Sequence, residues 1–221
     1  MEAPDSAQLL TALTTEHFTL QGARSQAMSE TSSRASVYMY SVSSALVALG
    51  FVSQVADGSD TVFGVFALTI LPTIYVLGCA TYVRLVECSA EDFRYGLAIN
   101  RIRGYYKELA GARADLFVLS GNDDGAGVFA NMGLAAERRS PAFAFSTAIA
   151  VVNGVVGGAV VGIVLSAVFD GRIWLSASVG VLVAAASVFG WLWHAARILA
   201  GAASDVTPHY PSPPQAPDRD R

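Results

Sequence analysis

The chain has 221 residues, of which 53% are hydrophobic and only 14% are charged, whereas about a quarter of the residues in a soluble globular domain are charged. Its formal net charge is −4 and no basic stripe is left unbalanced by acidic residues, so nucleic acid is not an expected partner. The hydrophobic residues are gathered into four long blocks instead of recurring at helix or strand periods, and this pattern predicts a membrane protein.

Residues 1–34 are predicted to form a cytoplasmic N-terminal segment. A secretory signal peptide needs a basic start followed at once by an apolar core. This segment instead begins with the acidic residues Glu2 and Asp5, and the first long apolar run starts only near Ala35. The first apolar block is therefore expected to act as the targeting signal.

Each of the four apolar blocks reaches or exceeds the roughly 20 residues that a helix needs to cross the hydrocarbon core of a bilayer. The blocks are residues 37–56, 62–86, 142–169 and 173–199. They contain no Asp, Glu or Lys, and their two arginines, Arg84 and Arg197, lie near block ends, where long side chains can reach the headgroups. The expected fold is an all-α integral membrane protein, a four-helix bundle whose transmembrane helices form two hairpins, residues 35–86 and 142–199.

The arginines set the expected orientation, because short loops rich in Lys and Arg remain in the cytoplasm. The loop at 57–61 has no basic residue and the loop at 170–172 has only Arg172, while every other basic residue lies on the opposite side of the blocks. Both termini are therefore predicted to face the cytoplasm. Lys107 is the only lysine; such a preference for arginine is typical of GC-rich bacteria, so the predicted location is a bacterial cytoplasmic (inner) membrane.

Residues 87–141 form the predicted cytoplasmic insert between the hairpins. Apolar residues recur at helical spacing over 90–110, which predicts an amphipathic helix. Ser89 and Asp92 resemble a capping box that would start this helix. The alternative is that the second membrane helix continues into the insert, because no proline lies between Pro72 and residue 110. The candidate cytoplasmic docking residues of this helix are Arg94, Arg101, Arg103, Tyr105, Tyr106 and Lys107.

The rest of the soluble chain has turn-forming or low-complexity composition. Turn-forming residues fill positions 120–133, and a second short helix is expected around residues 131–137. Five prolines follow residue 207, so the tail, residues 200–221, is predicted to be disordered. Extended proline-rich segments suit groove-binding protein modules, which makes the tail a second candidate for partner binding.

Small residues recur every four positions along the third apolar block, at Gly154, Gly158, Gly162 and Ser166. Such a glycine zipper lets two helix backbones approach closely in lipid. The fourth block repeats the pattern around Gly180. Two interpretations are open: the two small faces pack on each other within one subunit, or at least one of them faces a neighbouring subunit of a homo-oligomer.

Three further residues interrupt the apolar blocks. Asn153 lies near the middle of a predicted span and Gln54 near the outer end of the first one. Each amide serves either as an interhelical hydrogen-bonding contact or as a polar point on a permeation path. Pro72 lies in the middle of the second block, where its missing N–H predicts a helix bend and, as an alternative, a gating hinge.

No catalytic, cofactor or metal site is predicted. The sequence has no nucleophile elbow, HExxH, Walker or GxGxxG motif, and the predicted spans lack the midplane ionisable residues that intramembrane enzymes use. His17 and His209 lie in the terminal segments, so the histidines form no three-ligand cluster. The stretch from Asn122 to Gly125 resembles the start of a calcium loop but lacks the glutamate at the twelfth position. An enzyme is therefore not expected.

The stretch at 92–109, DFRYGLAINRIRGYYKEL, lies between the two predicted hairpins and resembles uncharacterised four-helix membrane proteins of actinobacteria. The layout is also loosely similar to the membrane effectors of bacterial conflict systems, and this resemblance implies oligomers that breach the inner membrane when a cytoplasmic sensor is triggered. The chain departs from the better-known effectors in lacking a recognisable ligand-binding domain.

Two functions follow as hypotheses. The leading one is a homo-oligomeric membrane protein whose zippered helices build a subunit interface and a pore or channel, controlled through the cytoplasmic insert. The alternative is a non-conducting membrane anchor or scaffold, embedded in the lipid bilayer, that recruits a cytoplasmic protein partner through the insert or the tail.

Overall fold

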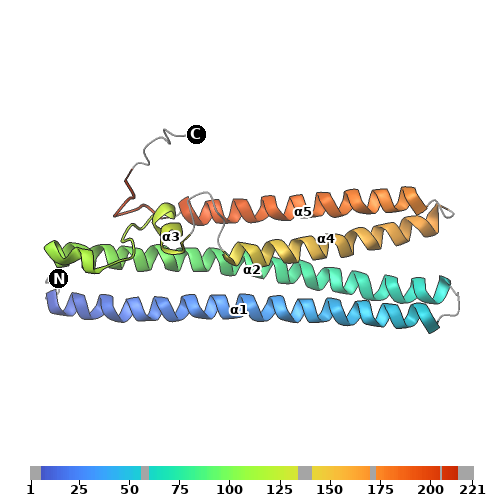
Figure 1. The fold of residues 1–221 in the computed structure, drawn as a ribbon, viewed down its shortest axis with the longest axis horizontal. Coiled ribbons are helices and arrows are strands. Elements are labelled where there is room, and N and C mark those ends of the chain that lie inside the picture. The colour runs from blue at the N-terminus through green and yellow to red at the C-terminus, as the bar shows by residue number, and fades with distance from the viewer. Residues whose placement is uncertain (1–5, 56–59, 134–140, 170–172, 205, 214–221) are drawn as a thin grey trace, which may run out of the picture. The chain divides into compact units, whose positions relative to one another are not determined.

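The computed structural model of the chain describes residues 6–55, 60–133, 141–169, 173–204 and 206–213. Within these ranges every regular element is a helix (Figure 1). The elements are α1 (Ser6–Val55), α2 (Asp60–Ala110), the 3-10 helix η1 (Gly111–Leu116), α3 (Gly125–Asn131), α4 (Pro141–Val168) and α5 (Ile173–Ser204). The predicted all-α fold is confirmed for the described part of the chain.

Four of these helices are long and apolar enough to cross a membrane. They are α1, α2, α4 and α5, and the most apolar 18-residue window of each has a mean hydropathy between 1.6 and 2.4. Eighteen helical residues rise about 27 Å, close to the thickness of a bilayer's hydrocarbon core. The four apolar blocks therefore correspond to four helices with the dimensions of membrane spans.

The helix α2 is continuous over 51 residues, which decides between the two alternatives for the insert. Ser89 is buried inside α2 and starts no new helix. Strong helix formers surround it and no proline or glycine pair interrupts the pattern, so residues 90–110 continue the second apolar helix. α2 also continues through Pro72, and the bend at that residue stays a prediction.

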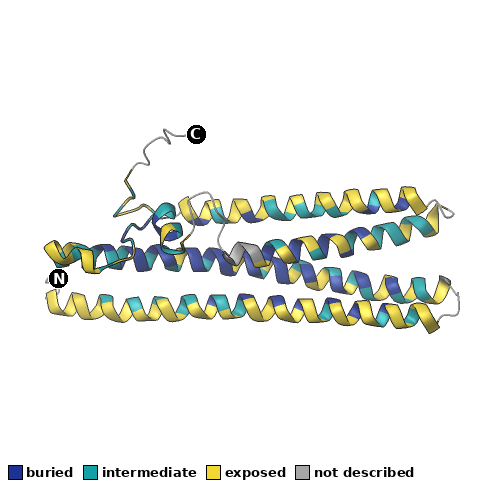
Figure 2. Ribbon diagram, in the orientation of Figure 1, coloured by how far each residue is buried: buried dark blue, intermediate teal, exposed yellow. Residues whose placement is uncertain are grey.

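The described residues divide into two compact units. The hydrophobic unit comprises residues 29–55, 60–88, 141–169 and 173–198, and the polar unit comprises residues 6–28, 89–133, 199–204 and 206–213. Figure 2 shows that buried residues follow one another closely along much of α2. The polar unit has its own small core, in which Ala90, Phe93 and Leu97 of α2 pack with Val128 and Ala202.

Two predictions for the polar unit need correction. Residues 125–131 form the helix α3 instead of a turn, because the Asp124 carboxylate accepts the Gly127 N–H at 2.8 Å and caps its first turn. The second short helix was expected at 131–137, but α3 ends at Asn131 and Gly133 has a φ of +69°, a common way to stop a helix. Residues 134–137 lie outside the described residues.

The prediction of a disordered tail is wrong for its described part. Residues 200–204 belong to α5, and residues 206–213 follow a defined path without regular structure. Composition predicts disorder because a proline-rich segment buries little apolar surface, but this segment is held by hydrogen bonds to charged side chains elsewhere in the polar unit. Residues 214–221 lie outside the described residues.

Candidate functional site

The predicted small-residue faces meet each other inside the hydrophobic unit. A Cβ on Gly180 would lie 2.6 Å from the carbonyl oxygen of Gly158, and a Cβ on Gly154 would lie 2.7 Å from Cγ2 of Val188. Gly162 approaches Ser176 more loosely, and the Ser166 hydroxyl donates to the Ile163 carbonyl of its own helix. These contacts correspond to the interpretation in which α4 packs on α5 within one chain.

Asn153 is enclosed in the hydrophobic unit and is only 1% exposed. The Tyr38 hydroxyl donates to Asn153 Oδ1 at 3.1 Å, and Asn153 Nδ2 donates to Cys79 Sγ at 3.4 Å. Gly78 provides the space, since a Cβ there would collide with the amide. The amide therefore joins helices α1, α2 and α4. This arrangement corresponds to the interpretation of Asn153 as an interhelical hydrogen-bonding contact.

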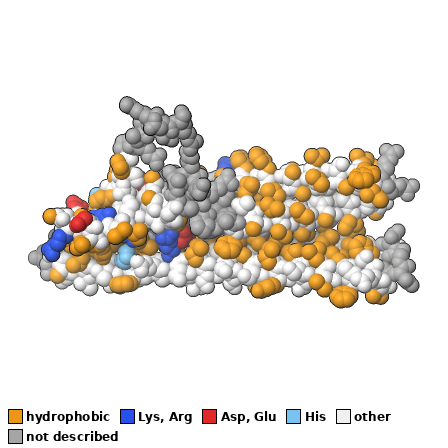
Figure 3. Space-filling model, viewed as in Figure 1, with side chains coloured by type: hydrophobic (Ala, Val, Ile, Leu, Met, Phe, Trp, Pro, Cys, Tyr) orange, Lys and Arg blue, Asp and Glu red, His pale blue; other side chains and the backbone are white. Residues whose placement is uncertain are grey.

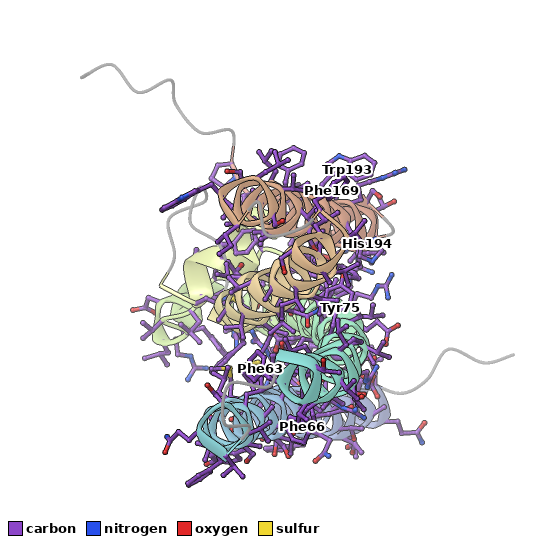
Figure 4. The ribbon with its side chains drawn as sticks, turned by 90° about the vertical axis from the view of Figure 1, so that its right-hand side faces the viewer. Phe63, Phe66, Tyr75, Phe169, Trp193 and His194 are labelled. Carbon is purple, nitrogen blue, oxygen red and sulfur yellow. The ribbon has the colours of Figure 1, made fainter. Side chains whose placement is uncertain are left out.

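The other two interrupting residues have fewer contacts. The Gln54 side chain is exposed near the end of α1 and makes no side-chain hydrogen bond to another described residue. Pro72 lines a small hollow of about 190 Å³ together with Tyr75 and Gly157. Tyr75 points from α2 towards α4 (Figure 4), and a Cβ on Gly157 would lie 2.6 Å from its ring. On the face shown in Figure 3, hydrophobic side chains are distributed along the whole hydrophobic unit.

In the polar unit, the loop before α3 binds the tail through a group of hydrogen bonds to carboxylates. Asp123 is 1% exposed. Its Oδ1 accepts the Tyr210 N–H at 2.6 Å and its Oδ2 accepts the His209 N–H at 3.0 Å, while Arg101 Nε donates to Oδ2 at 2.5 Å. The Asp123 N–H donates in turn to the Tyr210 carbonyl at 3.1 Å. One buried carboxylate thus binds two successive amides of the tail.

Neighbouring residues make further hydrogen bonds along the tail. Asp124 accepts the Ser212 N–H at 2.5 Å and the Ser212 hydroxyl at 2.7 Å. Asn122 Nδ2 donates to the Pro211 carbonyl at 3.3 Å, and Arg101 Nη2 donates to the Thr207 carbonyl at 2.5 Å. We call Arg101, Asn122, Asp123 and Asp124 the tail clamp.

The Tyr210 ring packs against Gly104 of α2. The ring lies so close to Gly104 that a Cβ there would fall 2.8 Å from its Cε2. Its hydroxyl donates to the Glu108 carboxylate at 2.9 Å. Burial and the nearby Glu108 raise the pKa of Tyr210 to about 12. The phenol therefore stays protonated, and able to donate, at any physiological pH.

A buried amide fixes the clamp loop on α2. Asn100, only 3% exposed, donates to the Asn122 carbonyl at 2.9 Å and accepts from Arg103 and Asn131 at 2.8 Å each. Arg103 and Asn131 also donate to the Ser120 carbonyl. Because a buried amide is costly unless it is bonded, Asn100 specifies where this loop lies. Sequence reasoning missed it, although a polar residue on the apolar face of a helix was a usable signal.

A cavity of about 510 Å³ lies beside the clamp within the polar unit. Its walls are mostly apolar and come from α1, α2 and the tail: Leu9, Leu13, Glu16, Leu20, Arg94, Leu97, Ala98, Arg101, Ile102, Tyr105, Val206, His209 and Tyr210. Ligand pockets in proteins commonly measure 300–1,000 Å³ and combine apolar walls with a few polar groups. The cavity has the size and lining of a binding site.

The six predicted docking residues divide among different tasks. Arg94 and Tyr105 line the cavity, Arg101 lines it and also binds the tail, and Arg103 binds the clamp loop. The Tyr106 hydroxyl lies 3.2 Å from Thr14 Oγ1 of α1. Lys107 is half-buried and has no ion pair among the described residues. The amphipathic pattern thus found the right helix, but it could not show which polar side chains were already bound.

Protonation of the clamp carboxylates in acid is expected to release the tail from the tail clamp. Burial alone would raise the pKa of Asp123, but the His209 and Tyr210 amides and Arg101 outweigh it and hold the pKa below its ordinary value of 3.8. The pKa of Asp124 is lowered in the same way by Ser212 and Gly127, against burial.

Groups with depressed folded-state pKa values stabilise the docked tail above pH 3.8, and that stabilisation is lost as the pH falls through their folded values. An environment-sensitive dye on Pro213→Cys should therefore report constant docking from pH 8 to 5 and release below about 3.8. Release between pH 5 and 7 would contradict this prediction.

Comparison with known proteins finds no matching family model, no matching curated protein and no matching solved structure. The resemblance of residues 92–109 to actinobacterial membrane proteins therefore gains no support from these comparisons. Among the described residues, no group of three or more His, Cys, Asp or Glu is placed to hold a metal ion. The function has to be argued from the cavity, the clamp and the four apolar helices.

Proposed function

We propose that this chain is a non-conducting, non-enzymatic anchor in the bacterial cytoplasmic membrane whose polar unit recruits a cytoplasmic protein. The four apolar helices cross the bilayer as two hairpins, and the arginine distribution puts both termini and the polar unit in the cytoplasm. The cavity beside α1 and α2 carries the proposal, because it presents apolar side chains on the half of the chain expected to face water.

The contacts of the hydrophobic unit support an anchor more than a pore. Asn153 is enclosed by Tyr38 and Cys79 and is not left facing an open path. The backbones of Gly158 and Gly180 contact each other, although these glycines also line an open apolar hollow of about 340 Å³. Residues that mark ion pathways normally face a water-filled cavity. These contacts support packing within one chain for the features that motivated the pore hypothesis.

The test combines conduction with capture. Liposomes containing the purified chain should leak K⁺ and a small dye no faster than empty liposomes. In living cells, the photo-crosslinking variant Tyr105→p-benzoylphenylalanine should capture one defined cytoplasmic protein. The matched control is Tyr40→p-benzoylphenylalanine on the hydrophobic unit, where Tyr40 is 72% exposed and should meet only lipid.

The captured protein, once purified, should bind the chain in nanodiscs, and Leu13→Asp in the cavity wall should weaken that binding at least ten-fold. Selective ion flux through the liposomes, or capture equal at Tyr40 and Tyr105, would overturn the proposal.

A homo-oligomeric pore is the second candidate, and other glycines now favour it. Gly50, Gly64 and Gly190 have no neighbouring atom within 4 Å of where a Cβ would lie. Small residues on open helix faces allow close helix association in lipid. If this candidate is right, native mass spectrometry in nanodiscs should find an oligomer of three or more chains, and Gly50→Leu should dissociate that oligomer. A monomeric chain would exclude the pore hypothesis.

A further inference from the structure

The tail is bound the way a protein domain binds a short peptide. Residues 207–212 have no regular structure, and the tail clamp holds them mainly through their backbone groups. Side chains alternate along the segment: Tyr210 and Ser212 are half-buried, while His209 and Pro211 are exposed. Backbone hydrogen bonds that supply affinity, with alternate side chains supplying specificity, are typical of recognition of an extended peptide.

The tail clamp contacts particular chemical groups of this segment. Asp123 and Asp124 bind the N–H groups of residues 209, 210 and 212. Residue 211 is a proline, which has no N–H to satisfy, and its carbonyl accepts from Asn122. Gly104 makes room for an aromatic ring. The site therefore fits an extended segment in which tyrosine is followed by proline.

The segment is separable from the fold that holds it. The core of the polar unit includes Ala202, and Val206 packs against that core, but no residue from 207 to 212 belongs to it. The clamp loop is fixed independently, because Asn100 and Asn131 bind it to α2 and α3. Removing residues from 207 onwards would leave both the core and the empty clamp.

We infer that the tail clamp and Gly104 form a peptide-docking site, that the chain's own tail is its resident occupant, and that the recruited cytoplasmic protein enters with an extended Tyr-Pro segment in its place. The inference rests on the proposed function, because it names how the partner of the polar unit docks. A tethered tail has a high effective concentration at its own site. The intact chain is therefore largely closed, and the partner must compete with the tail.

The experiment measures docking of the tail peptide in trans. A fluorescent peptide with the sequence of residues 206–213 is titrated by anisotropy against the chain truncated after Val206, in lipid nanodiscs. The truncated chain should bind saturably, and the full chain at least ten-fold more weakly because its site is occupied. A peptide carrying Tyr210→Ala should bind at least ten-fold more weakly, whereas Tyr210→Phe, which loses only the bond to Glu108, should fall in between.

Variants of the truncated chain locate the site. Asp123→Asn should weaken peptide binding at least ten-fold, whereas Asp115→Asn, at an exposed carboxylate of η1 outside the clamp, should leave it unchanged. Amide hydrogen exchange at Val128 reports whether α3 is still folded. If truncation unfolds it, the full chain with Tyr210→Ala, whose tail is loosened but present, should take up the peptide more tightly than the native chain.

Three results would overturn the inference. They are no saturable binding by a folded truncated chain, equal binding by full and truncated chains, or no effect of Asp123→Asn. Failure of the inference is separate from failure of the proposed function. Crosslinking at Tyr105 without peptide docking would support the anchor proposal and contradict the peptide-docking site. Peptide docking without any captured partner would show that the site binds the chain's own tail and would contradict recruitment of a partner.

Discussion

Replacing Gly158 with leucine is expected to force α4 and α5 apart and destabilise the hydrophobic unit. The backbones of Gly158 and Gly180 approach each other so closely that no side chain fits between them. Overpacking of this kind costs about 1–3 kcal/mol, and more when the obstructing atoms are backbone, which cannot move aside. Gly180→Leu should act in the same way, since its Cβ would lie 2.6 Å from the Gly158 carbonyl oxygen.

Thermal unfolding in a mild detergent measures this loss. The matched control is Gly201→Leu on α5, where a Cβ would meet nothing within 4 Å, so its midpoint should remain close to that of the native chain. A native midpoint for Gly158→Leu would show that the two small faces do not pack within one chain. A selective loss of an oligomer in this variant, with the monomer intact, would restore the subunit-interface interpretation of these glycines.

The second large effect is expected from Asp123→Asn, which should release the tail at neutral pH. The native carboxylate is buried and binds two tail amides and Arg101. Hydrogen bonds to a charged group contribute roughly 1.5–3 kcal/mol, and a neutral amide can satisfy only some of these donors. The loss is moderated because the Arg101 side chain is 44% exposed, so water can solvate its charge.

Amide hydrogen exchange at residues 209, 210 and 212 is the measurement. In the native chain these N–H groups should be protected, and in Asp123→Asn they should exchange about ten-fold or more faster. Asp115→Asn is the control, because Asp115 is exposed and no hydrogen bond or ion pair joins it to the described residues of the tail. Equal protection in the native chain and in Asp123→Asn would contradict the assignment of Asp123 to tail binding.

The candidate site could be predicted from the sequence only in outline. The helical period over residues 90–110 identified the helix that carries Tyr105, Arg94 and the seat at Gly104. It could not identify Asp123, because a carboxylate in a turn-rich loop is usually solvated, and only its approach to the tail amides makes it a ligand. Proline content likewise misjudged the tail, since composition measures apolar burial and not hydrogen bonds offered by distant residues.

The four apolar helices were determined by the sequence by itself, and the physical reason is local. A run of some 20 residues without Asp, Glu or Lys can satisfy its backbone in lipid only as a helix, so the apolar parts of α1 and α2, together with α4 and α5, follow from composition alone. The continuation of α2 through Ser89 does not. Tertiary structure alone decided which small faces meet, that Asn153 bonds to Tyr38 and Cys79, and that the tail docks on Asp123. Each of these depends on residues far apart in the chain, and no local pattern records which of many possible partners a buried polar or small residue will meet.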